Sequence, residues 1–186
     1  VYLSSTGIYG TGKNTPYTEH DPVGPTTVHH KSKLEGEKVV QNLNKYLIIR
    51  TGWLFGGGVQ HEKNFVYKRY LEARNKDCIY ADNSQRGNPT YVENLAAQIQ
   101  FMLADGVFGI FNCVDSGAAS RYEYVKKIIE LFGLDCKVKQ GSKEMFKRIA
   151  PVSFNESAIN YKLDLMGINF MTPWKKSLEK YIDQIK

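Results

Sequence analysis

The sequence predicts an α/β fold with a parallel sheet, and three observations support this class. Apolar runs of strand length alternate with segments whose apolar residues recur at helical spacing. The run "YLIIRT" at residues 46–51 is apolar over most of its length, as in strands that helices cover on both faces. Clusters of glycine and proline separate the expected elements.

The first part of the chain predicts a strand, a long loop, a helix and a second strand. Residues 1–5 form the first strand, and the breakers between residues 7 and 25 make a loop. A helix is expected over residues 26–42, followed by the strand at 46–51. Its inward stripe of small and apolar side chains is expected to be Val28, Ser32, Gly36, Val39, Val40 and Leu43.

Further helices and strands alternate along the rest of the chain. They are expected at 64–74 (helix), 78–81 (strand), 92–103 (helix), 109–114 (strand), 120–133 (helix) and 172–185 (helix). Ser120 and Glu123 make a capping box, and Gly133 ends that helix. Thr172 is the expected cap of the last helix, with Pro173 in its first turn.

Length and composition predict a globular protein with a real core. The chain has 186 residues, 42% of them hydrophobic, which suits one domain or a domain and a part of another. No apolar run approaches the ~20 residues that cross a bilayer. The opening "VYLSSTGIYG" lacks the basic lead of a signal peptide. We therefore expect a soluble, cytoplasmic protein that does not bind membranes.

The net charge of +6 suits an anionic partner. A nucleotide, a sugar phosphate and nucleic acid all fit that description. The lysines are scattered over expected helix faces, and no nucleic-acid-binding motif is present. We therefore expect most lysines to be solvated surface and do not expect nucleic acid as a partner.

Cysteine and histidine spacing argues against a metal or redox site. These residues are Cys78, Cys113, Cys136, His20, His29, His30 and His61. No C-x-x-C pair exists, so reduced thiols packed in a core are expected. Adjacent helical histidines point about 100° apart and cannot easily share one ion, so no metal site is expected.

Neither glycine cluster is a nucleotide-phosphate fingerprint. "GIYGTG" at residues 7–12 follows a strand, but its spacing differs from G-x-G-x-x-G and no helix follows it. "GGG" at residues 56–58 lacks the Lys-Ser/Thr of a phosphate loop. Both clusters are interpreted as ordinary loops.

One pair in the first helix has a spacing that suits acid–base chemistry. His29 and Lys33 are four residues apart and so share a helical face. A positive ammonium beside a proton donor lowers the pKa of that donor, which suits acid–base catalysis. A lysine can also donate hydrogen bonds to a ribose hydroxyl. Thr6, at the end of the first strand, can bring a hydroxyl to the same place. On spacing alone, a solvated helix start is the favoured interpretation.

Several segments resemble one family in an ordered set. They are "SST" (4–6), "PTTVHHKSKLEGEKVV" (25–40), "LIIRTGWLFGGG" (47–58), "NF" (64–65), "GNPTYVENLA" (87–96) and "LMGINFMTPWKKSLEKYI" (165–182). Together they resemble the extended short-chain dehydrogenase/reductase superfamily. Within it, the resemblance is to dTDP-4-dehydrorhamnose reductases and NAD-dependent nucleotide-sugar epimerases and dehydratases.

The resemblance implies a Rossmann-type doubly wound parallel sheet and a small α/β substrate-binding domain. We expect residues 1–60 to form the remaining Rossmann part and residues 61–186 most of the substrate domain. Segments around 84–114 are expected to return to the Rossmann part. The family's Gly-rich cofactor half is missing, since the chain opens on what resembles the fifth strand. NAD or NADP binding is therefore expected to need a longer chain or a complementing N-terminal chain, and a homodimer is possible.

The family's catalytic set is Ser/Thr, then Tyr-x-x-x-Lys. The resemblance puts Thr6 on the first position, His29 on the tyrosine and Lys33 on the lysine. It also implies that Thr6, Lys33 and Gly52 bind the cofactor. Where the reductases often carry an acid beside the threonine, this chain has Gly7.

Four residues lie in segments that line the sugar-nucleotide cleft of such enzymes. They are Trp53, Asn64, Arg86 and Thr90. Each also has a purely structural interpretation. Trp53 can be a packed indole and Asn64 a helix cap. Arg86 can be a surface cation and Thr90 a turn residue. For Asn64 the two interpretations are evenly balanced.

These observations leave two functional hypotheses. The first is an NAD(P)-dependent reductase or epimerase of a 4-keto deoxysugar nucleotide. Its catalysis would be impaired because a neutral imidazole at His29 reaches less far than a phenol and is poorly matched as a proton donor. The second is a non-catalytic binding or regulatory subunit with the same fold, similar to methionine adenosyltransferase regulatory subunits. In either case this chain alone is expected to be inactive.

Overall fold

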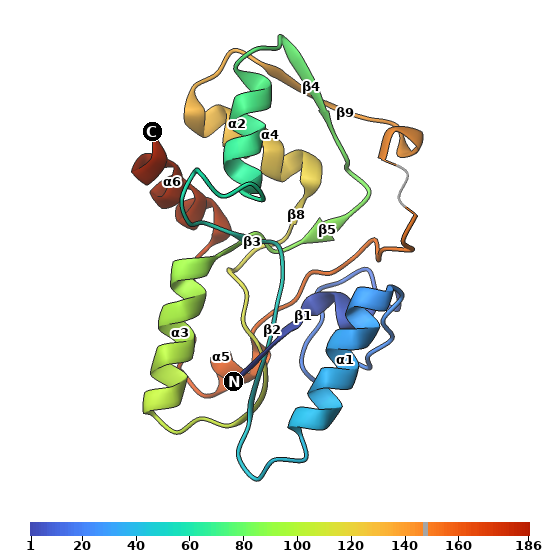
Figure 1. Cartoon of the computed structure of the whole chain (residues 1–186), viewed down its shortest axis with the longest axis vertical. Coiled ribbons are helices and arrows are strands. Elements are labelled where there is room, and N and C mark those ends of the chain that lie inside the picture. The colour runs from blue at the N-terminus through green and yellow to red at the C-terminus, as the bar shows by residue number, and fades with distance from the viewer. Residues whose placement is uncertain (147–148) are drawn as a thin grey trace.

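The computed structural model describes residues 1–146 and 149–186, which form two lobes (Figure 1). The first lobe holds the larger sheet with α1, α3 and α5. The second holds α2, α4 and α6 with pairs of short strands. Three short connections, at β3, β5 and β8, lie where the lobes meet (Figure 1).

A parallel sheet forms the centre of the first lobe, in the order β1-β2-β7. The strands are β1 (Tyr2–Ser5), β2 (Leu47–Thr51) and β7 (Gly109–Asn112). Helix α1 (Val28–Val40) covers one face, and α3 (Val92–Ala104) lies on the other side (Figure 1). Every residue of β2 is buried, as its apolar sequence requires for a central strand. The predicted α/β class and parallel sheet are confirmed.

The two faces of β2 divide between the helices. Leu47 and Ile49 join an apolar cluster with residues of α3 and with Leu163 of α5 (Tyr161–Leu165). Arg50, on the opposite face, reaches α1. Such alternation is the normal period of a strand, and it gives the sheet one apolar face and one face with a buried charge.

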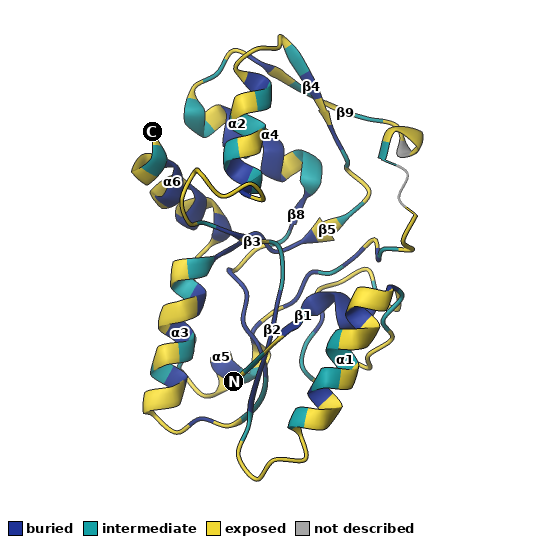
Figure 2. Cartoon of the chain, in the orientation of Figure 1, coloured by how far each residue is buried: buried dark blue, intermediate teal, exposed yellow. Residues whose placement is uncertain are grey.

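The inward face of α1 differs from the expected one. Val28 is 84% exposed and Val39 is 68% exposed, whereas His30 and Glu37 are buried. The Glu37 carboxylate accepts two hydrogen bonds from Arg50, at 3.1 Å (Nε) and 2.8 Å (Nη2). The predicted stripe was wrong because the helix faces the sheet through an ion pair, which an apolar pattern does not register. Much of this helix is coloured exposed or intermediate in Figure 2.

A buried network extends from that ion pair. Arg50 Nη1 donates to the Tyr9 hydroxyl at 3.1 Å, and Tyr9 donates to Asn112 of β7 at 2.7 Å. Burial raises the pKa of Tyr9 to about 12, so its hydroxyl keeps its proton at neutral pH. The network therefore joins the helix, two strands and the turn after β1 without any exposed charge.

The second lobe packs three helices around aromatic side chains. These are α2 (Phe65–Ala73), α4 (Arg121–Phe132) and α6 (Trp174–Ile185). Phe55 lies 5.5 to 6.0 Å, between ring centroids, from three buried tyrosine rings, which are Tyr91, Tyr124 and Tyr181. Strands β4 (Cys78–Ala81) and β9 (Lys137–Gln140) pair in parallel beside them. Dark buried faces point into this lobe, and exposed faces point outward (Figure 2).

Local signals at helix ends had mixed outcomes. The predicted capping box of Ser120 and Glu123 is present, and Gly133 ends α4 in the left-handed conformation at φ 68°. The predicted cap by Thr172 was wrong. Pro173 is the N-cap of α6 without a side-chain bond, and the Thr172 hydroxyl bonds Ser177 instead.

The short elements were not predicted. They are η1 (Thr6–Tyr9), β3 (Leu54–Phe55), β5 (Arg86–Gly87), β6 (Thr90–Tyr91), β8 (Ala119–Ser120) and η2 (Lys143–Phe146). Strand β3 pairs in parallel with β6, and β5 pairs antiparallel with β8. Two-residue strands carry no period in the sequence, so tertiary pairing alone defines them.

Three further findings bear on the compositional expectations. Cys113 and Cys136 are buried free thiols, as predicted for core cysteines, and Cys78 is half-buried. Within residues 1–146 and 149–186, no helix has the length and apolar character to cross a membrane. The division of the chain at residue 60 stays a prediction, although α3 and β7 pack with the first lobe.

Candidate active site

The carboxyl ends of β1 and β2 bring together two of the expected site residues. Thr6 begins η1 and is buried, and a Cβ added to Gly52 would lie 2.5 Å from its Oγ1. Glycine at position 52 therefore lets the hydroxyl approach the backbone after β2. Sequence reasoning missed Ser5, which ends β1, is half-buried and accepts a hydrogen bond from Gly7 N at 3.1 Å. Its position as the last residue of the strand was the available signal.

Lys33 reaches the first strand from α1. Its Nζ donates to the Leu3 carbonyl at 3.0 Å and lies 5.3 Å from the centroid of the Tyr2 ring. The ammonium thus sits over the edge of β1 that carries no partner strand among the described residues. The structure thus joins Lys33 to the backbone of the strand that ends in Ser5.

His29 lies differently from its expected position. Its side chain is exposed at the start of α1, and its ring centroid is 5.2 Å from that of His30. The structure therefore brings Thr6 to Gly52 and Lys33 to β1, and leaves His29 open to solvent. The expectation that Thr6, His29 and Lys33 lie at one place is not met for the imidazole, which is exposed.

His30, which sequence reasoning passed over, is the histidine that faces the interior. It is 9% exposed, and its Nδ1 is buried with no hydrogen-bond partner among the described residues. A Cβ on Gly7 would lie only 2.1 to 2.5 Å from the imidazole ring. Burial lowers the pKa of His30, and the nearby Glu156 carboxylate opposes that shift. The ring is therefore neutral at pH 7 and occupies the space that a side chain at position 7 would need.

Trp53 lies between the lobes in a constrained conformation. Its φ of 47° is left-handed, which is rare for a large side chain. The indole Nε1 donates to Glu156 at 3.0 Å, and the Arg121 guanidinium lies 3.5 Å from the ring centroid. A Cβ on Gly87 would meet the indole at 2.4 Å. The indole is thus fixed from three sides and remains half-exposed, as a residue that lines a cleft must be.

Asn64 and Thr90 serve the fold. Asn64 caps α2 by accepting from Tyr67 N, and its amide donates to the Tyr181 hydroxyl at 2.6 Å. Thr90 is 0% exposed, and its hydroxyl donates to the Asn88 carbonyl. The helix-cap and turn roles explain both residues, and Thr90 offers no surface to a ligand.

Arg86 is accessible and lies at the junction of the lobes. Its backbone bonds Phe154 and Glu156 at 2.8 Å each, which anchors the segment that crosses between the lobes. Its guanidinium lies 3.3 Å from Glu123 and is about half-exposed. Arg86 is therefore available to an anionic ligand from the side of the second lobe.

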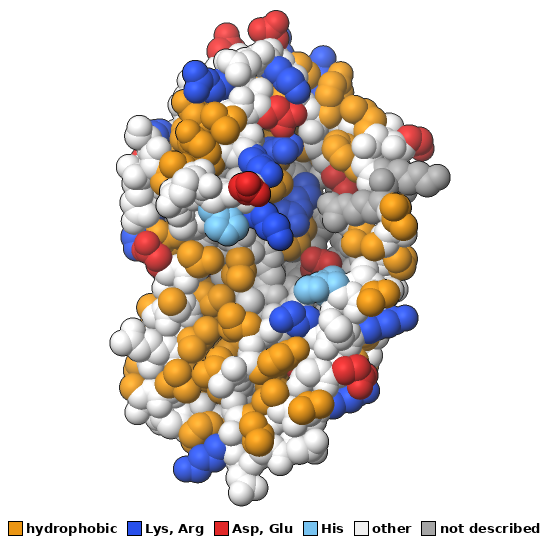
Figure 3. Space-filling view, viewed as in Figure 1, with side chains coloured by type: hydrophobic (Ala, Val, Ile, Leu, Met, Phe, Trp, Pro, Cys, Tyr) orange, Lys and Arg blue, Asp and Glu red, His pale blue; other side chains and the backbone are white. Residues whose placement is uncertain are grey.

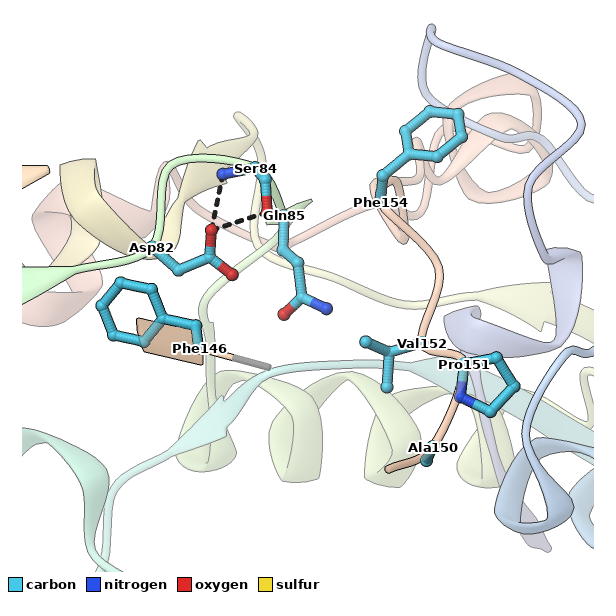
Figure 4. Close-up of a pocket in the computed structure, with 8 residues that line it drawn as sticks. All are labelled: Asp82, Ser84, Gln85, Phe146, Ala150, Pro151, Val152 and Phe154. Carbon is cyan, nitrogen blue, oxygen red and sulfur yellow. Dashed lines mark hydrogen bonds between the residues drawn. The ribbon is translucent and has the colours of Figure 1, made fainter. Parts of the chain in front are cut away.

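Two adjoining pockets open on the second lobe. One, of about 300 Å³, is lined by Phe65, Arg69, Tyr80 and Arg121 from α2, β4 and α4. The other, of about 270 Å³, shares Asp82 and Phe146 with it (Figure 4). The space-filling view shows the molecule hollowed between the lobes, with basic side chains on the wall of the second lobe (Figure 3). Aromatic rings beside guanidinium groups suit a planar base with a linked phosphate.

In the part of the chain that the structure describes, no group of three or more His, Cys, Asp or Glu side chains has the geometry to hold an ion. Between the lobes, the Glu156 carboxylate lies next to the Trp53 indole.

Comparison with known proteins finds relatives in polysaccharide biosynthesis and among dTDP-4-dehydrorhamnose reductases. SpsK, a spore coat polysaccharide biosynthesis protein of Bacillus subtilis, is 30% identical over 99% of this chain and 64% of its own length. The dTDP-4-dehydrorhamnose reductase of Mycobacterium tuberculosis H37Rv is 28% identical over 92% of this chain and 57% of its own. The chain therefore spans less than two thirds of these curated relatives.

Solved structures share the fold closely. A dTDP-4-dehydrorhamnose reductase from Clostridium acetobutylicum superposes with a TM-score of 0.92 and 34% identity, over 98% of this chain and 64% of its own. The Bacillus anthracis reductase in complex with NADP superposes with a TM-score of 0.91 and 28% identity, over 98% of this chain and 64% of its own. A Thermus thermophilus UDP-glucose 4-epimerase with NAD superposes with a TM-score of 0.77 and 18% identity, over 98% of this chain and 62% of its own. At that identity the likeness shows a shared fold only.

The sequence profile of one family covers the chain from end to end. It is described as the RmlD substrate binding domain and matches residues 1–186. The resemblance inferred from the ordered motifs is confirmed, as is the Rossmann-type α/β class. This chain belongs to the RmlD substrate-binding domain family.

Proposed function

We propose that this chain is the substrate-binding part of an NAD(P)-dependent reductase of 4-keto deoxysugar nucleotides. The observation that carries the proposal is the superposition on a dTDP-4-dehydrorhamnose reductase at a TM-score of 0.92 over 98% of the chain. Epimerisation is less well supported, because the epimerases superpose at under 20% identity. A cytoplasmic location and a homodimer or complementing N-terminal chain belong to this proposal.

The second lobe supplies the groups that a nucleoside diphosphate needs. Phe65 and Tyr80 offer apolar rings in the pocket of about 300 Å³, and Arg69 and Arg121 offer guanidinium groups beside them. Arg86 adds a half-exposed guanidinium near the cleft. A planar guanidinium can bind a phosphate through two parallel hydrogen bonds, so these arginines would hold the diphosphate and direct the sugar toward the first lobe.

The first lobe fits the nicotinamide end of a cofactor. The half-exposed Lys33 ammonium at β1 would hold the ribose hydroxyls, and the bare backbone of Gly52 beside Thr6 allows a ring to approach closely. When bound, the cofactor supplies the hydride. Its diphosphate would be held by residues outside this chain, because the chain contains no phosphate-binding glycine motif.

Lys33 and the hydroxyls at the end of β1 would act on the sugar carbonyl. Ser5 or Thr6 would orient the carbonyl oxygen, and Lys33 would bring positive charge beside it as negative charge develops there. His29, one helical turn from Lys33, would supply the proton. Its exposed ring must turn toward the strand end to do so.

Titration of the purified chain with NADPH tests whether this chain contains the whole cofactor-binding site or only its nicotinamide end. We expect a Kd well above 1 µM, because the chain carries only the nicotinamide end of the site. Fluorescence titration measures this directly. Binding below micromolar would show that the chain holds the whole cofactor site and would refute this part of the proposal.

Replacing His29 by tyrosine tests whether the imidazole limits catalysis. In the full-length protein we expect His29→Tyr to raise turnover of dTDP-4-dehydrorhamnose on the order of 10²-fold, because a phenol matches the proton transfer better. The His20→Tyr variant, which changes a histidine outside this helix, is the matched control. Equal turnover of wild type and His29→Tyr would mean that the side chain at position 29 does not donate the proton.

One observation favours a second function. His29 and Gly7 stand where the resemblance to the reductases implies a tyrosine and an acid, and the His29 ring is exposed. A non-catalytic binding or regulatory subunit with the same fold would keep the nucleotide pocket and lose the chemistry. Such a protein would bind dTDP-sugars and remain inert both as wild type and as His29→Tyr.

A further inference from the structure

The Trp53 indole is held in a strained and closely packed position. Its backbone φ of 47° lies in the left-handed region, which a large side chain keeps only where the surrounding structure fixes it. The indole Nε1 donates to the Glu156 carboxylate at 3.0 Å, and a Cβ on Gly87 would lie 2.4 Å from the ring. Strain of this kind concentrates at functional positions, so the fixed ring calls for a role beyond packing.

The Arg121 guanidinium lies over the face of this indole. Its Cζ is 3.5 Å from the centroid of the Trp53 ring and 5.3 Å from that of Phe65. Trp53 follows β2 of the first lobe, whereas Phe65 and Arg121 begin α2 and α4 of the second. Aromatic rings from two distant segments therefore attract one cation at the junction of the lobes.

Arg121 also lines the pocket of about 300 Å³ in the second lobe. The other arginine of that pocket, Arg69, is paired with Glu72 at 2.8 Å. The acidic lining residue, Asp82, accepts hydrogen bonds from Ser84 N and Oγ at 2.7 and 2.6 Å. Arg121 is therefore the lining cation that the indole holds in place.

A guanidinium can contact a ring and bind an anion at the same time. Its flat face meets the ring, while its N–H donors lie in its plane and can bind two oxygens of a phosphate. An arginine that a ring already fixes loses less conformational entropy on binding than a freely rotating one does. The ring thus increases the affinity for a phosphate that the ring itself does not contact.

We propose that Trp53 positions Arg121 for the diphosphate of the nucleotide. The inference rests on the proposed function and deepens it, because it makes an indole at the cleft a positioning residue for phosphate binding in the second lobe. Trp53 acts here through Arg121. Its effect is therefore expected on a ligand that has no sugar, whatever the indole contributes to binding the sugar.

Isothermal titration calorimetry of the full-length protein with dTDP, which has no sugar, tests the proposal. Trp53→Leu is expected to weaken dTDP binding about 3- to 30-fold, the range for loss of a cation–π contact. Trp53→Phe keeps an aromatic face and is expected to lose less. Phe108→Leu is the matched control, because it removes a ring 5.5 Å from Lys45 Nζ in the first lobe and should leave the affinity unchanged.

A double-mutant cycle shows whether Trp53 acts through Arg121. In an Arg121→Met background, Trp53→Leu should cause little further loss of dTDP affinity. In an Arg69→Met background it should keep its full effect, because Arg69 is paired with Glu72. Thermal unfolding followed by circular dichroism identifies variants that do not fold. If Trp53→Leu is one of them, Trp53→Phe is measured in the same two backgrounds.

Distinct results overturn the inference and the proposed function. Unchanged dTDP affinity in folded Trp53→Leu, or an undiminished loss in the Arg121→Met background, would show that the indole does not position Arg121. Binding of dTDP by the wild type would still support the proposed function in either case. Wild-type protein that does not bind dTDP would overturn the proposed function and the inference with it.

Discussion

Replacing Glu37 by glutamine is expected to lower the free energy of unfolding by about 3–5 kcal/mol. The carboxylate and the Arg50 guanidinium are almost fully buried, with side chains 1% and 7% exposed, and they form two hydrogen bonds. Glutamine leaves the arginine charge in the interior without its counter-charge. Urea unfolding followed by circular dichroism measures the change.

Glu35→Gln is the matched control for Glu37→Gln. It lies two residues away on the same helix and forms an exposed pair with Lys38 at 2.6 Å. Exposed pairs contribute about 0–1 kcal/mol, so this variant should unfold close to wild type. A double variant, Glu37→Leu with Arg50→Met, should recover much of the loss because it removes both charges. Similar losses for Glu35→Gln and Glu37→Gln would contradict a structural role for the buried pair.

Replacing Lys33 by methionine is expected to lower kcat/KM of the full-length protein by about 10²–10⁴-fold. The ammonium is held at β1 by the Leu3 carbonyl, two residues before the Ser5 that ends the strand. Methionine keeps the length of the side chain and removes the charge. Steady-state rates with dTDP-4-dehydrorhamnose and NADPH measure the effect, in the His29→Tyr background where the wild type is too slow.

Lys31→Met is the matched control on the same helix. Lys31 is exposed and forms no ion pair within the described residues, so its loss removes charge without touching the strand end. Its rate should equal that of the parent protein. Equal rates for Lys33→Met and Lys31→Met would show that the Lys33 side chain does not take part in catalysis.

The sequence predicts those parts of the fold that short-range patterns determine. The apolar run of β2, the strand at Cys78–Ala81 and the capping box at Ser120 each depend on a few neighbouring residues. Hydrophobic burial and local hydrogen bonds act at that range, so their positions can be read along the chain. The family membership was also predictable, because its motifs keep their order.

The remaining features depend on contacts between distant residues. The inward face of α1 follows Glu37 and Arg50, 13 residues apart, and the Trp53–Glu156 bond joins residues 103 positions apart. Neither has a local pattern. The motif pointed to His29, but which of two adjacent imidazoles is buried depends on the bare surface of Gly7.

The candidate site was therefore predictable in part. Lys33, Thr6, Gly52 and Trp53 lie at the strand ends or the cleft. Buried polar residues such as Thr90 match the motif equally well and serve the fold instead. Motif position alone cannot separate a side chain that lines a cleft from one that holds a turn, because both are polar and close in sequence.

Oxidation of NADPH by the full-length protein in the presence of dTDP-4-dehydrorhamnose is the most direct test of a nucleotide-sugar reductase. The loss of NADPH absorbance should depend on the sugar nucleotide and should be faster with His29→Tyr than with wild type. If neither protein oxidises NADPH, although both bind dTDP-rhamnose, the chain belongs to a binding protein and the proposed reductase activity is contradicted.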